Sequence, residues 1–158
     1  CNISSYRPLL VGVFQNQPLE EVLQKQKMYD LDIIQLHGDE PIEWATLIPV
    51  PVIKSFQPGR PGLARRGYHT VPLLDSASGG SGERLNLAAV RGILLKDLEL
   101  RLILAGGLDA ENLSAVMHEV GDVGSRIIGV DVSSGVEEDG LQSLPKITAF
   151  VKAAKSIR

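Results

Sequence analysis

Short apolar segments alternate with helix signals along the chain, and this alternation constrains the fold more than any other feature. Parallel strands covered on both faces have continuous apolar runs, whereas strands with one exposed face alternate apolar and polar residues. Six segments fit such strands: 9–14, 33–36, 52–56, 71–74, 101–104 and 127–132. Helices are expected to begin near Pro18, Asp39, Asn86, Asp109 and Leu141. The order predicts an α/β fold with a parallel sheet.

The number of β/α units favours part of a barrel. Segment 57–70 is rich in Gly, Pro and Arg and is expected to be a loop, so one of the β/α units lacks a clear helix. An open doubly wound sheet is the alternative, but no G-x-G-x-x-G turn follows the first strand. A complete (β/α)8 TIM barrel has eight units and roughly 200 residues or more. We therefore expect one domain, 1–158, that forms a partial barrel of about six units, corresponding to strands 3–8.

Composition excludes several classes of protein. The net charge is -3 and aromatic residues make up 4%, so the chain has no basic footprint for nucleic acid. No apolar run approaches the ~20 residues of a membrane span, and no signal peptide is visible. A lone cysteine, Cys1, fits a reducing compartment, and we expect a cytoplasmic protein. His37, His69 and His118 are far apart in sequence, so no metal site is expected.

Two neighbouring strand-to-loop junctions suit a phosphate. Strand 127–132 contains Asp131 near its end and is followed by Ser133, Ser134 and a glycine, whose hydroxyl and N–H groups can converge on an anion. Strand 101–104 runs into Gly106 and Gly107 before the next helix. Phosphate sites commonly lie after the last two strands of a barrel. A pair of ordinary glycine turns is the alternative.

Polar residues at other strand ends are further candidates. Asp75 directly follows a strand and precedes a Ser/Gly-rich segment, 76–82, which favours a catalytic carboxylate under a lid over a turn cap. His37 either contacts substrate or caps its strand. Lys54, inside an apolar strand, either contacts substrate or pairs with an acid of a neighbouring strand. Asp131 either orients sugar hydroxyls or braces the serine turn.

From about Leu9 to its C-terminus the sequence resembles the phosphoribosylanthranilate isomerase family of tryptophan biosynthesis. Five segments occur in the family's order: 10–16 (LVGVFQN), 35–40 (QLHGDE), 73–76 with 79–82 (LLDS, GGSG), 104–108 with 111–112 (LAGGL, EN) and 130–137 (VDVSSGVE). The short Ser/Gly segment and residues 66–69 look most like fungal versions. In fungi this domain is often fused to indole-3-glycerol-phosphate synthase and a glutamine amidotransferase.

The resemblance implies an Amadori rearrangement of N-(5'-phosphoribosyl)anthranilate, an aminoaldose, to an aminoketose, without metal or organic cofactor. Asp75 matches the family's general acid. Phosphate-binding positions match Gly106, Gly107, Ser133 and Ser134, and pocket-lining positions match His37 and Asp131.

The family's general base, a cysteine in a Lys-x-Cys-Gly setting, and its anthranilate-binding arginine are not matched. Cys1 is followed by Asn2 rather than glycine, and Arg7 fits a linker. We therefore expect that two barrel units are absent. The chain alone is then expected to be unstable and inactive, and the full-length protein to be the isomerase.

Two alternatives stay open. One is another phosphate-binding barrel enzyme, such as indole-3-glycerol-phosphate synthase or a ribulose-phosphate epimerase relative. The other is a non-catalytic, degenerate barrel.

Overall fold

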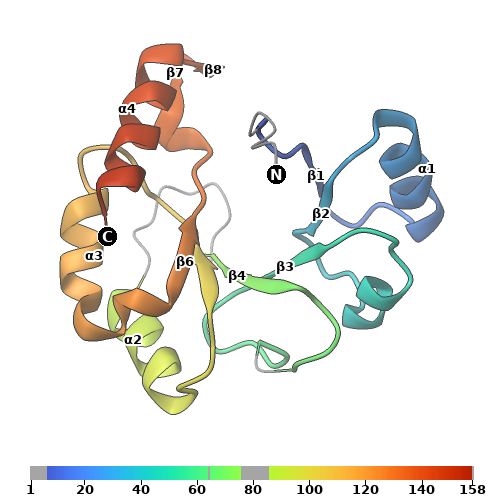
Figure 1. Ribbon diagram of the computed structural model, residues 1–158, viewed down its shortest axis with the longest axis horizontal. Coiled ribbons are helices and arrows are strands. Elements are labelled where there is room, and N and C mark those ends of the chain that lie inside the picture. Colours follow the sequence, from blue (N-terminus) through green and yellow to red (C-terminus); the bar gives the residue numbers. More distant parts are fainter. Residues whose placement is uncertain (1–6, 64, 76–85, 158) are drawn as a thin grey trace, which may run out of the picture. The chain divides into compact units, whose positions relative to one another are not determined.

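The computed structural model describes residues 7–63, 65–75 and 86–157 (Figure 1). The chain divides into two compact units, Cys1–Ser55 with Arg65–Val71, and Phe56–Ala64 with Pro72–Arg158, which are described separately. The first contains β1 (Val11–Phe14), β2 (Ile33–Leu36) and most of β3 (Val52–Phe56). The second contains most of β4 (Val71–Leu74) together with β5 (Leu102–Leu104) and β6 (Ile127–Val130). In both units, neighbouring strands run parallel and follow the order of the chain. The expected α/β class is therefore confirmed.

In the first unit two strand–helix connections cover one core. Its elements are β1 (Val11–Phe14), α1 (Leu19–Tyr29), β2 (Ile33–Leu36), the 3-10 helix η1 (Ile42–Thr46) and β3 (Val52–Phe56). Residues 11–14 pair in parallel register with 33–36, and residues 34–36 pair with 52–54. The helix α1 begins after Pro18 and ends at Tyr29, and its C-cap residue Asp30 has a φ of 50°, which lets the chain turn back toward β2. The buried side chains include Phe14, Val22 and Ile34, and Trp44 packs against them.

The prediction of a helix that begins at Asp39 is wrong in both the type of helix and its first residue. Only a short 3-10 helix, η1, forms, and it begins at Ile42. The Glu40 carboxylate turns inward and accepts hydrogen bonds from the N–H groups of Asn16 and Gly38. Because Glu40 braces a loop rather than a helix terminus, the backbone stays extended through Pro41, at ψ 134°.

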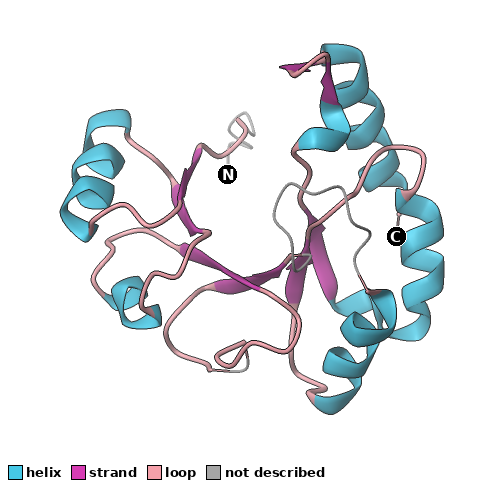
Figure 2. Cartoon of the chain, turned by 180° about the vertical axis from the view of Figure 1, so that it is seen from behind, coloured by secondary structure: helices cyan, strands magenta, loops and turns pink. Residues whose placement is uncertain are grey.

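The second unit places its helices against strands β4 to β6, on one side of them (Figure 2). Its elements are β4 (Val71–Leu74), α2 (Leu87–Lys96), β5 (Leu102–Leu104), α3 (Leu113–Val120), η2 (Gly121–Arg126), β6 (Ile127–Val130), η3 (Ser134–Val136), β7 (Glu137–Glu138), β8 (Leu141–Gln142) and α4 (Leu144–Ser156). The Asn86 side chain caps α2 by accepting the Ala89 N–H at 3.0 Å. Leu73, Leu74 and Leu104 are fully buried, so the strands of this unit form its core.

Two helix starts in this unit lie later than expected. Asp109 forms a side-chain turn with the N–H groups of Glu111 and Asn112, so α3 begins at Leu113. Before α4 the chain forms the β7–β8 hairpin, whose turn residues Asp139 and Gly140 have φ of 52° and 76°. None of the helices in the described residues has the length and apolarity to cross a bilayer.

Candidate active site

Three strand ends of the second unit share one hydrogen-bond register. The N–H of Asp75 donates to the Phe56 carbonyl at 2.9 Å, that of Ala105 to Leu74 at 2.9 Å, and that of Asp131 to Leu104 at 2.8 Å. Each donor is the first residue after its strand, so all three lie at the carboxyl edge. Neighbouring strands lie about 4.8 Å apart, so Asp75 and Asp131 lie on either side of Ala105 with their backbones roughly 10 Å from each other. The register thus brings together two acids selected from the sequence.

The two predicted phosphate loops meet next to this edge. Gly106 and Gly107 turn the chain after β5 with φ of 99° and 63°, conformations that favour glycine. Gly135, in the loop after β6, lies so close to Leu108 that a Cβ atom there would overlap the Leu108 carbonyl oxygen. Ser133 and Ser134 precede this contact and are exposed.

The backbone donors of these loops are available to an anion. Among the described residues, none accepts a hydrogen bond from the N–H groups of Gly106, Gly107, Ser133 or Ser134. Clustered N–H groups of this kind bind phosphate through their partial positive charge. The loops therefore have the donors and the proximity that a phosphate site requires.

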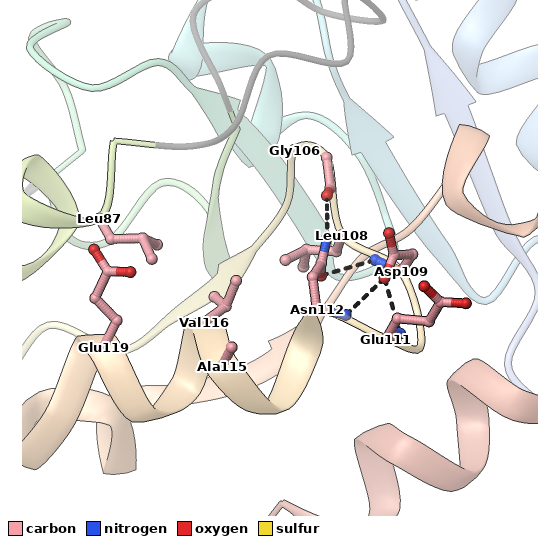
Figure 3. A pocket seen from close by; sticks show the side chains of 10 residues that line it. Leu87, Gly106, Leu108, Asp109, Glu111, Asn112, Ala115, Val116 and Glu119 are labelled. Carbon is pink, nitrogen blue, oxygen red and sulfur yellow. Dashed lines mark hydrogen bonds between the residues drawn. The ribbon is translucent and has the colours of Figure 1, made fainter.

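Asn112 braces the glycine turn from the start of α3. Its side-chain amide donates to the Gly107 carbonyl at 2.8 Å, and its side-chain oxygen accepts the Asp109 N–H at 3.1 Å (Figure 3). Asp109 in turn accepts the N–H of Asn112 at 2.7 Å. Sequence analysis took Asp109 as a helix start and Asn112 as part of a family segment, and missed that both residues brace the glycine turn.

A pocket of about 600 Å³ opens beside the same loop but does not suit phosphate. It is lined by Leu87, Gly106, Gly107, Leu108, Asp109, Glu111, Asn112, Ala115, Val116 and Glu119. Three of these residues are acids, and the lining has no cation, so a phosphate would be repelled. Of the candidate residues only the two glycines, Gly106 and Gly107, line this pocket.

In the first unit, His37 occupies the equivalent place after β2. Its N–H donates to the Phe14 carbonyl at 2.8 Å, and its half-buried ring lies with Nδ1 3.1 Å from the buried Gln35 amide nitrogen. This separation is within hydrogen-bond distance, so the Gln35 amide restrains the orientation of the ring. Gln35 was missed as a partner, although residues two apart on a strand share a face.

Lys54 forms the ion pair that was one of its two expected roles. Its ammonium lies 3.1 Å from a Glu40 carboxylate oxygen, and both side chains are buried. Burial would raise the pKa of Glu40, but the Asn16 N–H and the Lys54 ammonium outweigh it, and the pKa lies below its ordinary value. The sequence indicated an acid from a neighbouring strand; the acid is in the loop after β2.

Arg65 is a surface residue, and two parts of the sequence discussed above lie outside the described residues. The Arg65 guanidinium pairs with Glu43 at 3.3 Å and stacks 4.6 Å from the Tyr68 ring, as a surface charge does. Cys1 and the Ser/Gly segment 76–82 lie outside the described residues. Within the ranges that are described, no cluster of three or more metal-ligating side chains occurs.

Comparison with known proteins identifies the family. Residues 1–153 match the model of the N-(5'phosphoribosyl)anthranilate (PRA) isomerase family. A "Multifunctional tryptophan biosynthesis protein" of Schizosaccharomyces pombe is 44% identical over 158 residues, which include 98% of this chain. The chain spans only 20% of the length of that relative.

Solved structures agree with the sequence match. Phosphoribosyl anthranilate isomerase from Thermus thermophilus has a TM-score of 0.75 at 39% identity, covering 95% of this chain and 74% of its own. A phosphoribosyl anthranilate isomerase in complex with reduced 1-(o-carboxyphenylamino)-1-deoxyribulose 5-phosphate has a TM-score of 0.72 at 32% identity, covering 93% and 71%. These likenesses confirm the expected partial (β/α)8 barrel. The single domain 1–158 stays a prediction. The chain belongs to the N-(5'-phosphoribosyl)anthranilate isomerase family.

Proposed function

We propose that the native protein catalyses the Amadori rearrangement of N-(5'-phosphoribosyl)anthranilate to 1-(o-carboxyphenylamino)-1-deoxyribulose 5-phosphate. The observation that carries this proposal is the common strand-end register of Asp75, Ala105 and Asp131 beside two loops with available N–H donors. Family membership and the phosphorylated ligand of a solved relative support it. An acid and an anion site at one sheet edge are what a sugar-phosphate isomerase needs.

Asp75 is the general acid of this proposal. Its proton goes to the ribose ring oxygen, the C1–O bond breaks, and the ring opens to a protonated Schiff base. A base then removes the C2 proton to give an enolamine, which tautomerises to the ketone. Asp131 accepts hydrogen bonds from sugar hydroxyls, and His37 contributes to substrate binding.

The phosphate-binding role belongs to Gly106, Gly107, Ser133 and Ser134. Their N–H and hydroxyl groups hold the 5-phosphate without a cationic side chain, which fits the net charge of -3. Binding through the non-reacting phosphate fixes the sugar relative to Asp75, and such remote binding contributes to the chemical step.

The test is Asp75→Asn in the protein as the cell makes it, with Asp122→Asn as the matched control. Asp122 is an exposed carboxylate of the same unit, 2.6 Å from Arg91. Steady-state kinetics should show kcat lower by about 100-fold or more for Asp75→Asn, because general acids contribute 10²–10⁴-fold. Inorganic phosphate should bind both variants equally. Turnover that is absent from the wild-type protein while phosphate still binds would support the non-catalytic barrel.

The setting of this activity is also proposed. We infer a cytoplasmic protein fused to further tryptophan-pathway domains, since a relative of Schizosaccharomyces pombe is named as multifunctional. Immunoblotting of cell fractions with an antibody to this chain tests both the location and the size of the polypeptide.

A further inference from the structure

A buried lysine in the first unit binds the backbone on both sides of His37. The Lys54 ammonium donates to the Gly38 carbonyl at 2.6 Å and lies 3.4 Å from the Leu36 carbonyl. Lys54 is 6% exposed, so the ammonium has exchanged water for these oxygens and for Glu40. An ammonium has three donors. Here all three are directed at the segment that carries His37 and at its acidic partner.

Glu40 holds the same segment from the other side. One carboxylate oxygen accepts the Asn16 N–H at 2.7 Å, and the other accepts the Gly38 N–H at 2.9 Å together with the Lys54 ammonium. The Asn16 side chain in turn accepts the Asp39 N–H at 2.8 Å. The loop after β1 and the loop after β2 are thereby fastened together around one ion pair.

The close packing at Gly38 leaves this arrangement little freedom. A Cβ atom at position 38 would overlap the Asn16 side-chain oxygen and would lie 2.9 Å from the Asn16 backbone nitrogen. Together with the Gln35 amide beside the ring, these contacts restrain both the backbone and the imidazole of His37. Such restraint is expected where a side chain must meet a ligand in one geometry.

Stability alone is a weak reason for such a pair. Buried ion pairs lose so much solvation that apolar residues of similar size are often equally or more stabilising. The pair contacts the backbone of both chain neighbours of His37, Leu36 and Gly38, and also the Asn16 N–H. Contacts placed in this way would hold the backbone of His37 in one position.

We propose that Lys54 and Glu40 are positioning residues that fix His37 for substrate binding. The substrate-binding part rests on the proposed isomerase function. The restraint on His37 does not, and it can be measured in the free protein.

The test compares Lys54→Met/Glu40→Gln with the control Lys25→Met. The double variant removes both buried charges but keeps one side-chain oxygen at position 40, which can accept from the N–H group of Asn16 or of Gly38, whereas the two Glu40 oxygens accept from one each. Lys25 is a surface lysine of the same unit, paired with Glu21 at 2.6 Å. In the native protein, kcat/KM should fall up to about 100-fold in the double variant, mainly through KM, because small misplacements have effects of that size. The control should keep wild-type kinetics.

The ¹⁵N NMR signals of the histidine rings give a readout that does not depend on activity. The His37 Nδ1 and Nε2 signals should shift or broaden in the double variant, while those of His118, which lies in the second unit, stay in place. Inactive wild-type protein would refute the proposed function yet leave this readout intact. Unchanged His37 signals together with unchanged KM in the folded double variant would overturn the proposal. If that variant does not fold, unchanged His37 signals in Glu40→Gln overturn it.

Discussion

Replacing Gly135 by alanine should separate the two loops for which we propose phosphate binding. The added Cβ would overlap the Leu108 carbonyl oxygen and would lie 3.0 Å from both the Leu108 carbonyl carbon and Val132 Cγ2. Unstrained carbon contacts are about 3.5–4.0 Å, so relief requires a movement of roughly 1 Å. The Val132 side chain can rotate away, but a backbone carbonyl moves only with its loop. Overpacking of this kind destabilises by about 1–3 kcal/mol.

The same movement should weaken anion binding. The N–H groups of Ser133 and Ser134 come directly before Gly135, so a 1 Å shift changes their distance to any anion held by Gly106 and Gly107. We expect inorganic phosphate to bind at least tenfold more weakly, a loss of about 1.4 kcal/mol. Urea denaturation measures the free energy of unfolding, and ³¹P NMR titration measures the dissociation constant for phosphate.

Gly92→Ala is the matched control for this experiment. Gly92 lies in α2 of the same unit, and a Cβ there would meet nothing within 4 Å. Alanine should therefore stabilise the helix by about 0.5–1 kcal/mol and leave phosphate binding unchanged. If Gly135→Ala matched Gly92→Ala in both measurements, the close approach of the loops would have no energetic importance, and the reasoning would be refuted.

Two further changes test the bracing of each unit. Asn112→Ala removes the hydrogen bond to the Gly107 carbonyl and should lower the free energy of unfolding, measured by urea denaturation, by about 1 kcal/mol. The variant should also bind inorganic phosphate more weakly. An unchanged affinity for phosphate would show that the glycine turn keeps its shape without Asn112. Because the pKa of Glu40 is lowered in the folded state, its contribution to stability is fully present above the unfolded-state pKa of about 4.3 and is lost as pH falls through the folded value. Denaturation curves should therefore show that the free energy of unfolding falls less below about pH 4 in Lys54→Met/Glu40→Gln than in wild type. An equal fall in both proteins would contradict a lowered pKa of Glu40.

The strands could be predicted from sequence because each is a short continuous apolar run, which is the pattern of a strand buried in a parallel sheet. Segments 33–36, 52–56 and 71–74 match the observed strands residue for residue. The predicted strands that differ are longer than the observed ones, and their surplus residues lie at the ends. Apolar periodicity locates a strand, whereas its last residue depends on where the neighbouring strand stops pairing.

The helix starts were harder because the same residue types serve caps and loop braces. Asp39 and Glu40 before Pro41 have the composition of a first helical turn, yet Glu40 is buried against Lys54. Its partners are the N–H groups of Asn16 and Gly38, and Asn16 lies 24 residues earlier in the chain. Local propensity cannot reveal a partner at that separation. A lysine inside an apolar strand did indicate that some acid would be buried with it.

The strand-end positions of the candidate residues were predictable from sequence, but their contacts were not, and the register explains the difference. In a parallel sheet the first residue after each strand donates its N–H to the last residue of the preceding strand, so its place at the edge follows from strand boundaries alone. His37, Ala105 and Asp131 meet this condition in the structure. The contact of Gly135 with Leu108 depends on how two loops bend after leaving the strands, which no spacing in the sequence encodes. Residues that follow a strand can therefore be placed near the sheet edge before the fold is known, whereas the contacts that shape the loops require the structure.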